Sequence, residues 1–185
     1  MLIDALVAGH SQAGDVLYTR LIRVVEWSIG RVVGRQLTQR EDLVQAAFEQ
    51  IVTTLYRGTF SRECSLASWA AAVSTRLALS ELRTARRIRR NFGQAVELTE
   101  MALPSHERDA EALAAARQQL AHVRQALSEV HPDNAEVLVL RELNQLPLPE
   151  IAQLLNLSMT ATYSRLSRGK KELAERLALI TQEQQ

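Results

Sequence analysis

Hydrophobic residues recur every three or four positions through most of this chain, a spacing that places them on one face of an α-helix. Leu43, Ala47, Ile51 and Leu55 are one example, with polar residues between them. Asp15 follows a Gly-containing turn and is expected to cap the second helix. The predicted helices cover residues 2–8, 16–34, 40–56, 66–90, 110–130, 134–146 and 149–155, and a last helix begins at residue 159.

The helical pattern is lost over one long stretch, "NFGQAVELTEMALPSHERDAE", which is acidic and contains Gly93 and Pro104. We interpret residues 93–109 as a short linker between a domain at 1–92 and a domain at 110–185. The predicted fold class is therefore all-α, with two small helical domains. The second is a four-helix module that contains a helix-turn-helix.

Composition agrees with an all-α fold, because the dominant Leu, Ala, Arg, Gln and Glu lose little rotamer freedom in helices. Hydrophobic residues make up 46% of the chain, enough for a buried core. Cys64 is the only cysteine, so an intramolecular disulfide is excluded. The chain shows no secretory signal or transmembrane-length apolar run, and we expect a cytoplasmic protein.

The net charge of +1 averages over opposed regions. Residues 76–90 hold six arginines against one glutamate, whereas residues 97–111 are acidic. Arg76, Arg83, Arg87 and Arg90 are separated by seven, four and three residues, which places them along one helical face, with Arg86 nearby. Such a line can follow a phosphate backbone, although an arginine-rich helix end can also be merely solvated.

The stretch "PEIAQLLNLSMTATYSRLSRGKK", residues 149–171, has the pattern of a helix, a tight turn and a second helix. Ser158 is expected to cap the second helix. Its predicted inward face holds Met159, Thr162, Leu166 and Leu173. Its predicted outward face, which could bond base edges and phosphates, holds Thr160, Tyr163, Ser164, Ser167 and Arg168, with Arg165, Lys170 and Lys171 alongside. The alternative is an ordinary helical hairpin with a basic, solvated end.

Both halves resemble parts of a known family. "EVLVLREL", "EIAQLLNLS" and "SRLSRGKKEL" are similar to region 4 of the extracytoplasmic-function sigma factors, a branch of the sigma-70 family. "REDLVQAAF", Phe60, "SW" at 68–69 and "LRTARRIRR" resemble region 2. The two matches occur in the family's order and cover nearly the whole chain.

The resemblance implies a sigma factor that binds core RNA polymerase, through its β′ and β subunits, and double-stranded promoter DNA. It implies a β′ contact at Asp42, Gln45, Phe48 and Glu49, although a polar stripe on a helix is by itself most simply its solvated side. It implies recognition of the −10 element by Arg76, Arg83, Arg86, Arg87 and Arg90. It implies recognition of the −35 element by Ser158, Thr160, Tyr163, Ser164, Arg165, Ser167, Arg168, Lys170 and Lys171. An anti-sigma factor is a further partner that the family suggests.

The chain departs from the family pattern at Arg76 and Ser80, where Asn and Asp are common, and in "TATYSRL", where "GTVKSRL" is usual. These changes leave promoter melting and promoter sequence open, and a relative that binds polymerase but initiates poorly remains an alternative. A stand-alone helix-turn-helix regulator is another. An enzyme is not favoured, because the histidines are scattered and no metal or cofactor motif is present.

Overall fold

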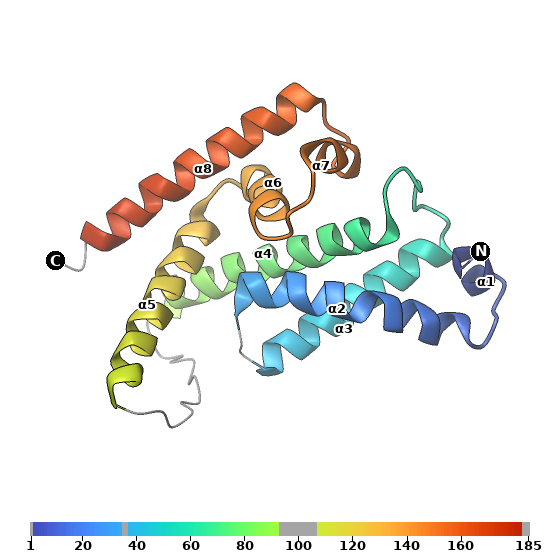
Figure 1. Ribbon diagram of the computed structural model, residues 1–185, viewed down its shortest axis with the longest axis horizontal. Helices are drawn as coiled ribbons and strands as arrows, with labels where there is room; N and C mark the ends of the chain where they lie inside the picture. The colour runs from blue at the N-terminus through green and yellow to red at the C-terminus, as the bar shows by residue number, and fades with distance from the viewer. Residues whose placement is uncertain (1, 35–36, 93–106, 183–185) are drawn as a thin grey trace.

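The computed structural model describes residues 2–34, 37–92 and 107–182, which form helices and connecting turns without a strand (Figure 1). This confirms the all-α prediction. The helices are α1 (Leu2–Val7), α2 (Ala13–Val33), α3 (Leu37–Tyr56), α4 (Leu66–Phe92), α5 (Glu107–Glu129), α6 (Pro132–Glu142), α7 (Leu148–Leu154) and α8 (Met159–Gln182).

The N-terminal half, α1–α4, is built around the apolar faces that the helical spacing predicts. In α3, Ala47, Ile51 and Leu55 are fully buried against α2 and α4, and Leu43 is partly buried at the edge of the same cluster. Leu17, Leu21, Val25 and Ile29 form the facing stripe of α2. Val16, in the first turn of α2, is instead exposed.

The C-terminal half, α5–α8, is the predicted four-helix module. Helix α6 is its centre, because nearly every residue from 134 to 140 is buried. Helix α8 runs across α5 and α6, and α7 packs against its N-terminal end (Figure 1). One face of α8 is therefore covered by the module and the opposite face is directed outward.

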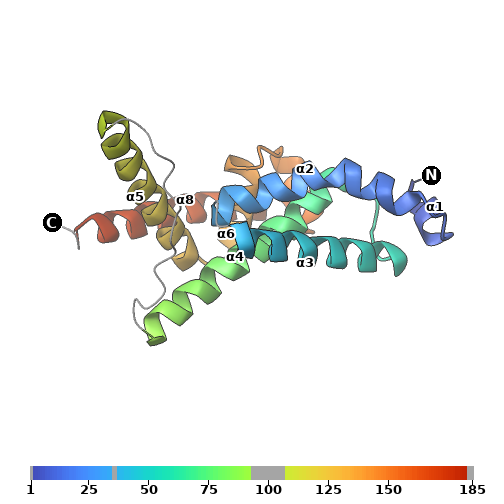
Figure 2. The same cartoon turned by 90° about the horizontal axis from the view of Figure 1, so that it is seen from below.

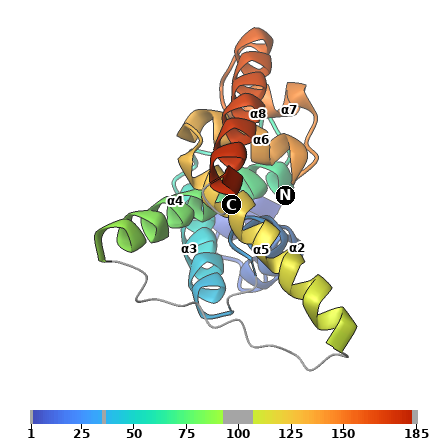
Figure 3. The same ribbon diagram turned by 90° about the vertical axis from the view of Figure 1, so that its left-hand side faces the viewer.

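The two halves lie against each other. Helices α5 and α6 pack on α4, and the buried residues of both halves belong to one continuous cluster. Beyond this contact, the C-terminal end of α4 and the N-terminal end of α5 project in different directions (Figures 2 and 3). Residues 93–106 of the predicted linker lie outside the described residues, and residues 107–109 form the first turn of α5.

Several helix ends differ from the sequence prediction. Helix α2 begins at Ala13, so Asp15 lies in its first turn and is not its cap. Helix α6 ends at Glu142, four residues before the predicted end, because the chain turns there and Gln145 adopts a left-handed conformation with φ of 58°. Pro132 occupies the first turn of α6, as predicted.

Candidate protein and nucleic-acid interfaces

A groove between α2 and α3 brings together three of the four residues predicted to contact polymerase. Gln45, Phe48 and Glu49 line it, and the Gln45 side chain donates a hydrogen bond of 3.0 Å to Glu49. Phe48 packs against Tyr18 of α2 with their ring centroids 4.8 Å apart. Asp42 is exposed one turn earlier on α3, outside the groove lining.

Sequence reasoning missed the contribution of α2 to this α2–α3 groove. Tyr18, Ile22 and Glu26 form one wall, and Val44 and Val52 supply apolar surface from α3. Tyr18 is half exposed although it is a large aromatic residue. One signal in the sequence could have revealed this role: Tyr18 follows the buried Leu17 directly and therefore lies at the edge of the apolar face of α2. The groove combines an apolar floor with a polar rim, the composition of a protein-binding surface.

The arginines of α4 differ in their surroundings. Arg87 and Arg90 are exposed near the projecting end of the helix. Arg76 is also exposed, but its guanidinium donates two hydrogen bonds, of 3.1 and 2.8 Å, to one carboxylate oxygen of Glu136 in α6. Arg86 forms an ion pair of 3.1 Å with Glu129 of α5. Part of the predicted DNA-binding line is thus paired with acidic residues of the other half.

Arg83 lies between these ion pairs and is only partly accessible. Its Nε and Nη2 atoms are buried and have no hydrogen-bond partner among the described residues. This burial lowers the pKa of Arg83, and the nearby Glu136 carboxylate acts in the opposite direction. A guanidinium with buried, unbonded donors is unfavourable and would gain from an anionic partner.

The outward face of α8 is present as predicted. Tyr163, Ser164, Ser167 and Arg168 are all exposed, and Tyr163 is 57% accessible. Thr160 lies on the exposed first turn with them. Thr162 and Leu166 are buried and Leu173 is partly buried, as predicted. Met159, predicted to face inward, is the exception and is 39% exposed.

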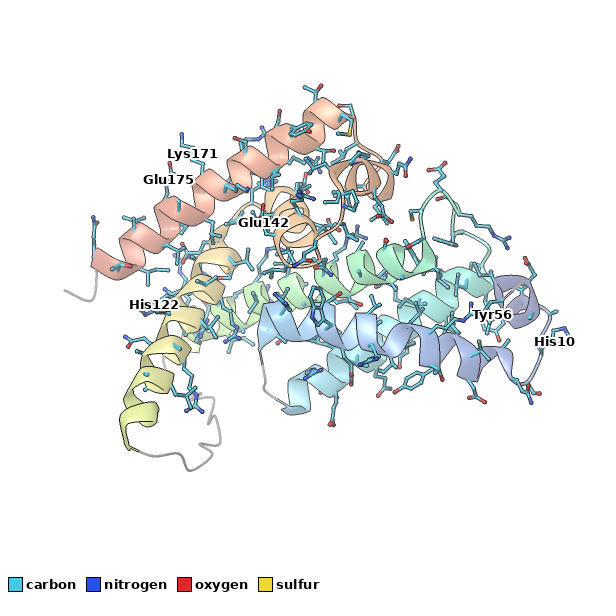
Figure 4. All side chains as sticks on the ribbon, in the orientation of Figure 1. His10, Tyr56, His122, Glu142, Lys171 and Glu175 are labelled. Atoms are coloured by element: carbon cyan, nitrogen blue, oxygen red, sulfur yellow. The ribbon has the colours of Figure 1, made fainter. Side chains whose placement is uncertain are left out.

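The cations that flank this face are held by carboxylates. Arg165 forms an ion pair of 2.9 Å with Asp133, and Lys170 forms one of 2.8 Å with Glu142 of α6. Lys171 lies 3.9 Å from Glu175 one turn along α8 (Figure 4). These pairs are solvent-accessible and can exchange for DNA phosphates at little cost.

The turn before α8 has the hydrogen bonds that fix a helix-turn-helix angle. Asn156 is left-handed, with φ of 51°, and the Leu157 N–H donates to the Ala152 carbonyl at 2.8 Å, which closes α7. The Ser158 hydroxyl accepts the Ala161 N–H at 3.1 Å, so Ser158 caps α8 as predicted.

The sequence also drew attention to Trp69, Cys64 and the histidines. Trp69 is partly buried and packs against Phe60, with centroids 5.0 Å apart. Burial raises the pKa of the Cys64 thiol, with smaller contributions from Glu150 and Glu63, which favours an unreactive protonated thiol. His10 and His122 are far apart (Figure 4), and the described residues contain no cluster of side chains suited to a metal ion.

Among the described residues, no helix is long and apolar enough to cross a membrane.

Both halves of the chain are similar to known proteins. The family model for sigma-70 region 2 matches residues 17–88, and the model for sigma-70 region 4 matches residues 120–173. Among solved structures, CnrH, determined in complex with the cytosolic domain of CnrY, has the same fold with a TM-score of 0.58 and 22% sequence identity over 96% of each chain. A search of curated proteins found no match.

Proposed function

This chain belongs to the sigma-70 family of RNA polymerase sigma factors, and from that premise we propose that it is a two-region factor of the extracytoplasmic-function type. It directs core polymerase to promoters by binding alone, without a catalytic step of its own, and acts in the cytoplasm. The observation that carries the proposal is the consecutive match of regions 2 and 4 together with the outward face of α8, in which exposed hydroxyls and Arg168 follow a capped helix-turn-helix.

The α2–α3 groove is the proposed docking site for polymerase. Its apolar surface around Phe48 and Tyr18 provides burial, and Gln45 and Glu49 provide a polar rim. Asp42 lies on the exposed side of α3 and extends this rim. Aromatic residues in such settings often dominate binding energy. Replacement of Phe48 by Ala is therefore expected to weaken polymerase binding more than replacement of Asp42.

The proposed DNA contacts lie on two helices. On α4, Arg87 and Arg90 are directly available for phosphates of the −10 element, whereas Arg76, Arg83 and Arg86 are covered or paired. On α8, we assign Arg168 to a base of the −35 element, and the exposure of Arg168, Ser164 and Ser167 supports this assignment. Arg165, Lys170 and Lys171 hold the flanking phosphates after their ion pairs exchange.

Run-off transcription tests this proposal. Core polymerase with and without the protein is incubated with DNA from just upstream of the protein's own gene and with a randomised promoter library. We expect transcripts that depend on the protein. Arg168→Ala should reduce them roughly 5- to 150-fold, the range expected when a bidentate contact to guanine worth about 1–3 kcal/mol is lost. Arg57→Ala is the matched control, because Arg57 is exposed outside both proposed DNA faces.

Two other outcomes decide between the alternatives. Binding of core polymerase without any transcript, even from the library, would indicate a relative that has lost promoter opening, with Arg76 and Ser80 as the first residues to revert toward the family pattern. DNA binding without any affinity for core polymerase would contradict the sigma-factor assignment and favour a stand-alone regulator.

An anti-sigma factor is proposed as a regulatory partner. CnrH, which shares this fold, was solved in complex with the cytosolic domain of CnrY. In the present chain, the α2–α3 groove offers an apolar surface that a helix of such a partner could occupy in competition with polymerase. Glu49→Lys, compared with Glu63→Lys in the exposed loop before α4, would show whether the two partners share this surface.

A further inference from the structure

Helix α2 has an outward side that takes no part in the proposed polymerase or DNA contacts. Val16, Arg20, Arg23, Trp27 and Arg31 follow one another at intervals of three or four residues, which places them along one side of the helix. All five residues are exposed, and Val16 and Trp27 are each 40% accessible. We call these five residues the outer face of α2.

The arginines of the outer face of α2 have no acidic partners. Among the described residues, Arg20, Arg23 and Arg31 form no ion pair, whereas Arg40 at the start of α3 lies 4.0 Å from Glu26. Glu26 lines the α2–α3 groove, on a different side of the helix from the three arginines. Three exposed cations along one side of a helix produce a positive potential that attracts an anionic partner.

Trp27 gives the outer face of α2 an aromatic centre. The Arg31 guanidinium lies over the Trp27 ring, with its Cζ 4.4 Å from the ring centroid. Tryptophan is enriched where membrane lipid meets water, because its ring is apolar and its N–H is polar. Arginine can bury its aliphatic stem in the same layer while the guanidinium reaches lipid phosphates. Val16 adds exposed aliphatic surface at the N-terminal end of the face.

The shape and composition of this face favour a bilayer over a nucleic-acid strand. Proteins that bind single strands hold them in positively charged grooves. The α2–α3 groove is lined by Tyr18, Ile22 and Glu26, and the outer face of α2 contributes none of its residues to that lining. The outer face is the crest of a helix whose opposite side is buried, and such a crest can lie on a flat surface. Val16 would gain from burial in lipid and gains nothing from a phosphate backbone.

We propose that the outer face of α2 binds peripherally to the surface of an anionic membrane. Trp27 and Val16 lie at the level of the lipid headgroups, and Arg20, Arg23 and Arg31 contact lipid phosphates. The helix lies in the plane of the bilayer, as amphipathic interfacial helices do. The anionic lipids of the cytoplasmic leaflet provide the negative surface. The proposal goes beyond the proposed function and uses none of the residues assigned to polymerase or DNA.

Vesicle sedimentation with the full chain tests the charged part of the face. Vesicles of phosphatidylcholine alone are compared with vesicles that contain about one-third phosphatidylglycerol. Arg20→Gln with Arg23→Gln is the test variant. Arg57→Gln with Arg89→Gln is its control, because both arginines are exposed elsewhere and the control has the same net charge.

Tryptophan fluorescence tests the aromatic part. Trp27 and Trp69 are the two tryptophans of the chain, so Trp69→Phe leaves Trp27 as the only emitter. Trp27→Ala is the binding variant, and Tyr56→Ala is its control, since Tyr56 is a 53% exposed aromatic residue of α3 outside the outer face of α2. Circular dichroism should show unchanged helix content in every variant, because each of these exposed side chains lies outside the core.

We expect the chain to bind the anionic vesicles and not the phosphatidylcholine vesicles, with an affinity that falls as salt is added. The Arg20 and Arg23 variant should bind roughly 25-fold more weakly, since each arginine near an anionic surface contributes about fivefold. Its control should stay within about threefold of the wild type, because its charges lie away from the bilayer. Trp27→Ala should also weaken binding, unlike Tyr56→Ala, and the Trp27 emission should shift to shorter wavelength on anionic vesicles.

Three results would each overturn the proposal: no binding to anionic vesicles at low salt, an equal loss in the arginine variant and its control, or an unshifted Trp27 emission on bound vesicles. Binding of a short single strand that depends on Arg20 and Arg23, without vesicle binding, would overturn it too and assign the face to nucleic acid. Run-off transcription contains no lipid, so a failure of the proposed function in that assay is distinguishable from a failure here.

Discussion

At the scale of single residues, Glu172 shows how α8 is tied to the start of α6. Its carboxylate accepts the backbone N–H of His131 at 2.7 Å and the side-chain amide of Asn134 at 2.6 Å. His131 precedes the first residue of α6 and provides no side-chain cap of its own. A glutamate on another helix therefore takes the place of the capping side chain and adds a favourable negative charge near the helix N-terminus.

We predict that Glu172→Ala destabilises the protein by about 1–3 kcal/mol, because it leaves a partly buried amide and a helix N–H without their acceptor. Urea unfolding followed by circular dichroism measures this free energy. Glu175→Ala on the same helix is the control, since Glu175 is exposed and lies 3.9 Å from Lys171 in a surface ion pair, and the change should alter stability by less than about 0.5 kcal/mol. Equal effects of the two changes would show that Glu172 does not cap α6.

Neither Glu172 nor Asn144 could be assigned its role from the sequence. Glu172 stands in a run of charged residues that suggests a solvated surface, and its partners lie about forty residues earlier. Asn144 belongs to the polar turn "NQLPLPE" and pairs with Ser28 across 116 positions of sequence. Helical periodicity shows which face of a helix is buried, but it carries no information about a hydrogen bond between distant segments.

At the scale of elements, α6 and α8 approach closely at one glycine. Gly169 is buried in the middle of α8, and a Cβ atom there would lie 2.8 Å from the backbone carbonyl oxygen of Asn134. Because that neighbour is backbone, it cannot move aside without displacing α6. The close approach places the rest of the α8 inner face, including Leu166 and Thr162, in the module's interior.

Gly169→Ala is therefore expected to destabilise the protein by about 1–3 kcal/mol through overpacking, although alanine is the better helix former. Thermal unfolding and urea unfolding measure the change. Gly14→Ala is the matched control, because Gly14 is also helical and has no atom within 4 Å of an added Cβ; it should be neutral or stabilise by up to about 1 kcal/mol. A stable Gly169→Ala variant would mean that α8 is not held against α6 at this point.

The helices themselves were largely predictable, and in α3 the residues Ala47, Ile51 and Leu55 are buried as the helical period predicts. The apolar face was less exact elsewhere, because Val16 of α2 is exposed. The ends of the helices were less predictable than their buried faces. Helix α6 is stopped by a left-handed Gln145 in the turn, a conformation that glycine or asparagine would have signalled. The outward face of α8 was predictable from the alternation of hydroxyl, basic and apolar residues after Ser158. The ion pairs of Arg165 and Lys170 were not predictable, because their partners Asp133 and Glu142 lie on a different helix, α6.

At the scale of the whole molecule, the sequence predicts two modules but not their contact. Thr75 of α4, whose hydroxyl donates a hydrogen bond to Asn144 of the C-terminal half, is fully buried although it is polar. A threonine at this position gives no sequence signal of burial, and helix α6 packs against α4 together with α2, α3 and α5. The arginine line likewise has two environments, exposed at Arg87 and Arg90 and covered at Arg83.

A double-mutant cycle at the far edge of the contact tests the arrangement without DNA or polymerase. Gly34→Ala should destabilise the wild-type protein mainly through backbone strain at φ of 90°, and to a smaller extent because the guanidinium of Arg124 in α5 must move aside. In an Arg124→Ala background only the strain remains. The two costs should therefore differ by a small coupling free energy, near the lower end of the range of about 0.5–3 kcal/mol for residues in contact, because the guanidinium ends a flexible side chain and can move aside. Urea unfolding measures this difference.

The cycle separates the contact from the strain because both backgrounds contain the same backbone change. Strictly additive costs would show that the Arg124 guanidinium does not cover Gly34 in solution or moves aside freely. A positive coupling together with an expanded scattering profile for Gly34→Ala would show that a single methyl group at the end of α2 is enough to loosen the C-terminal half. That result would connect the geometry of one glycine to the accessibility of the arginines on α4, which lie on the other side of the same contact.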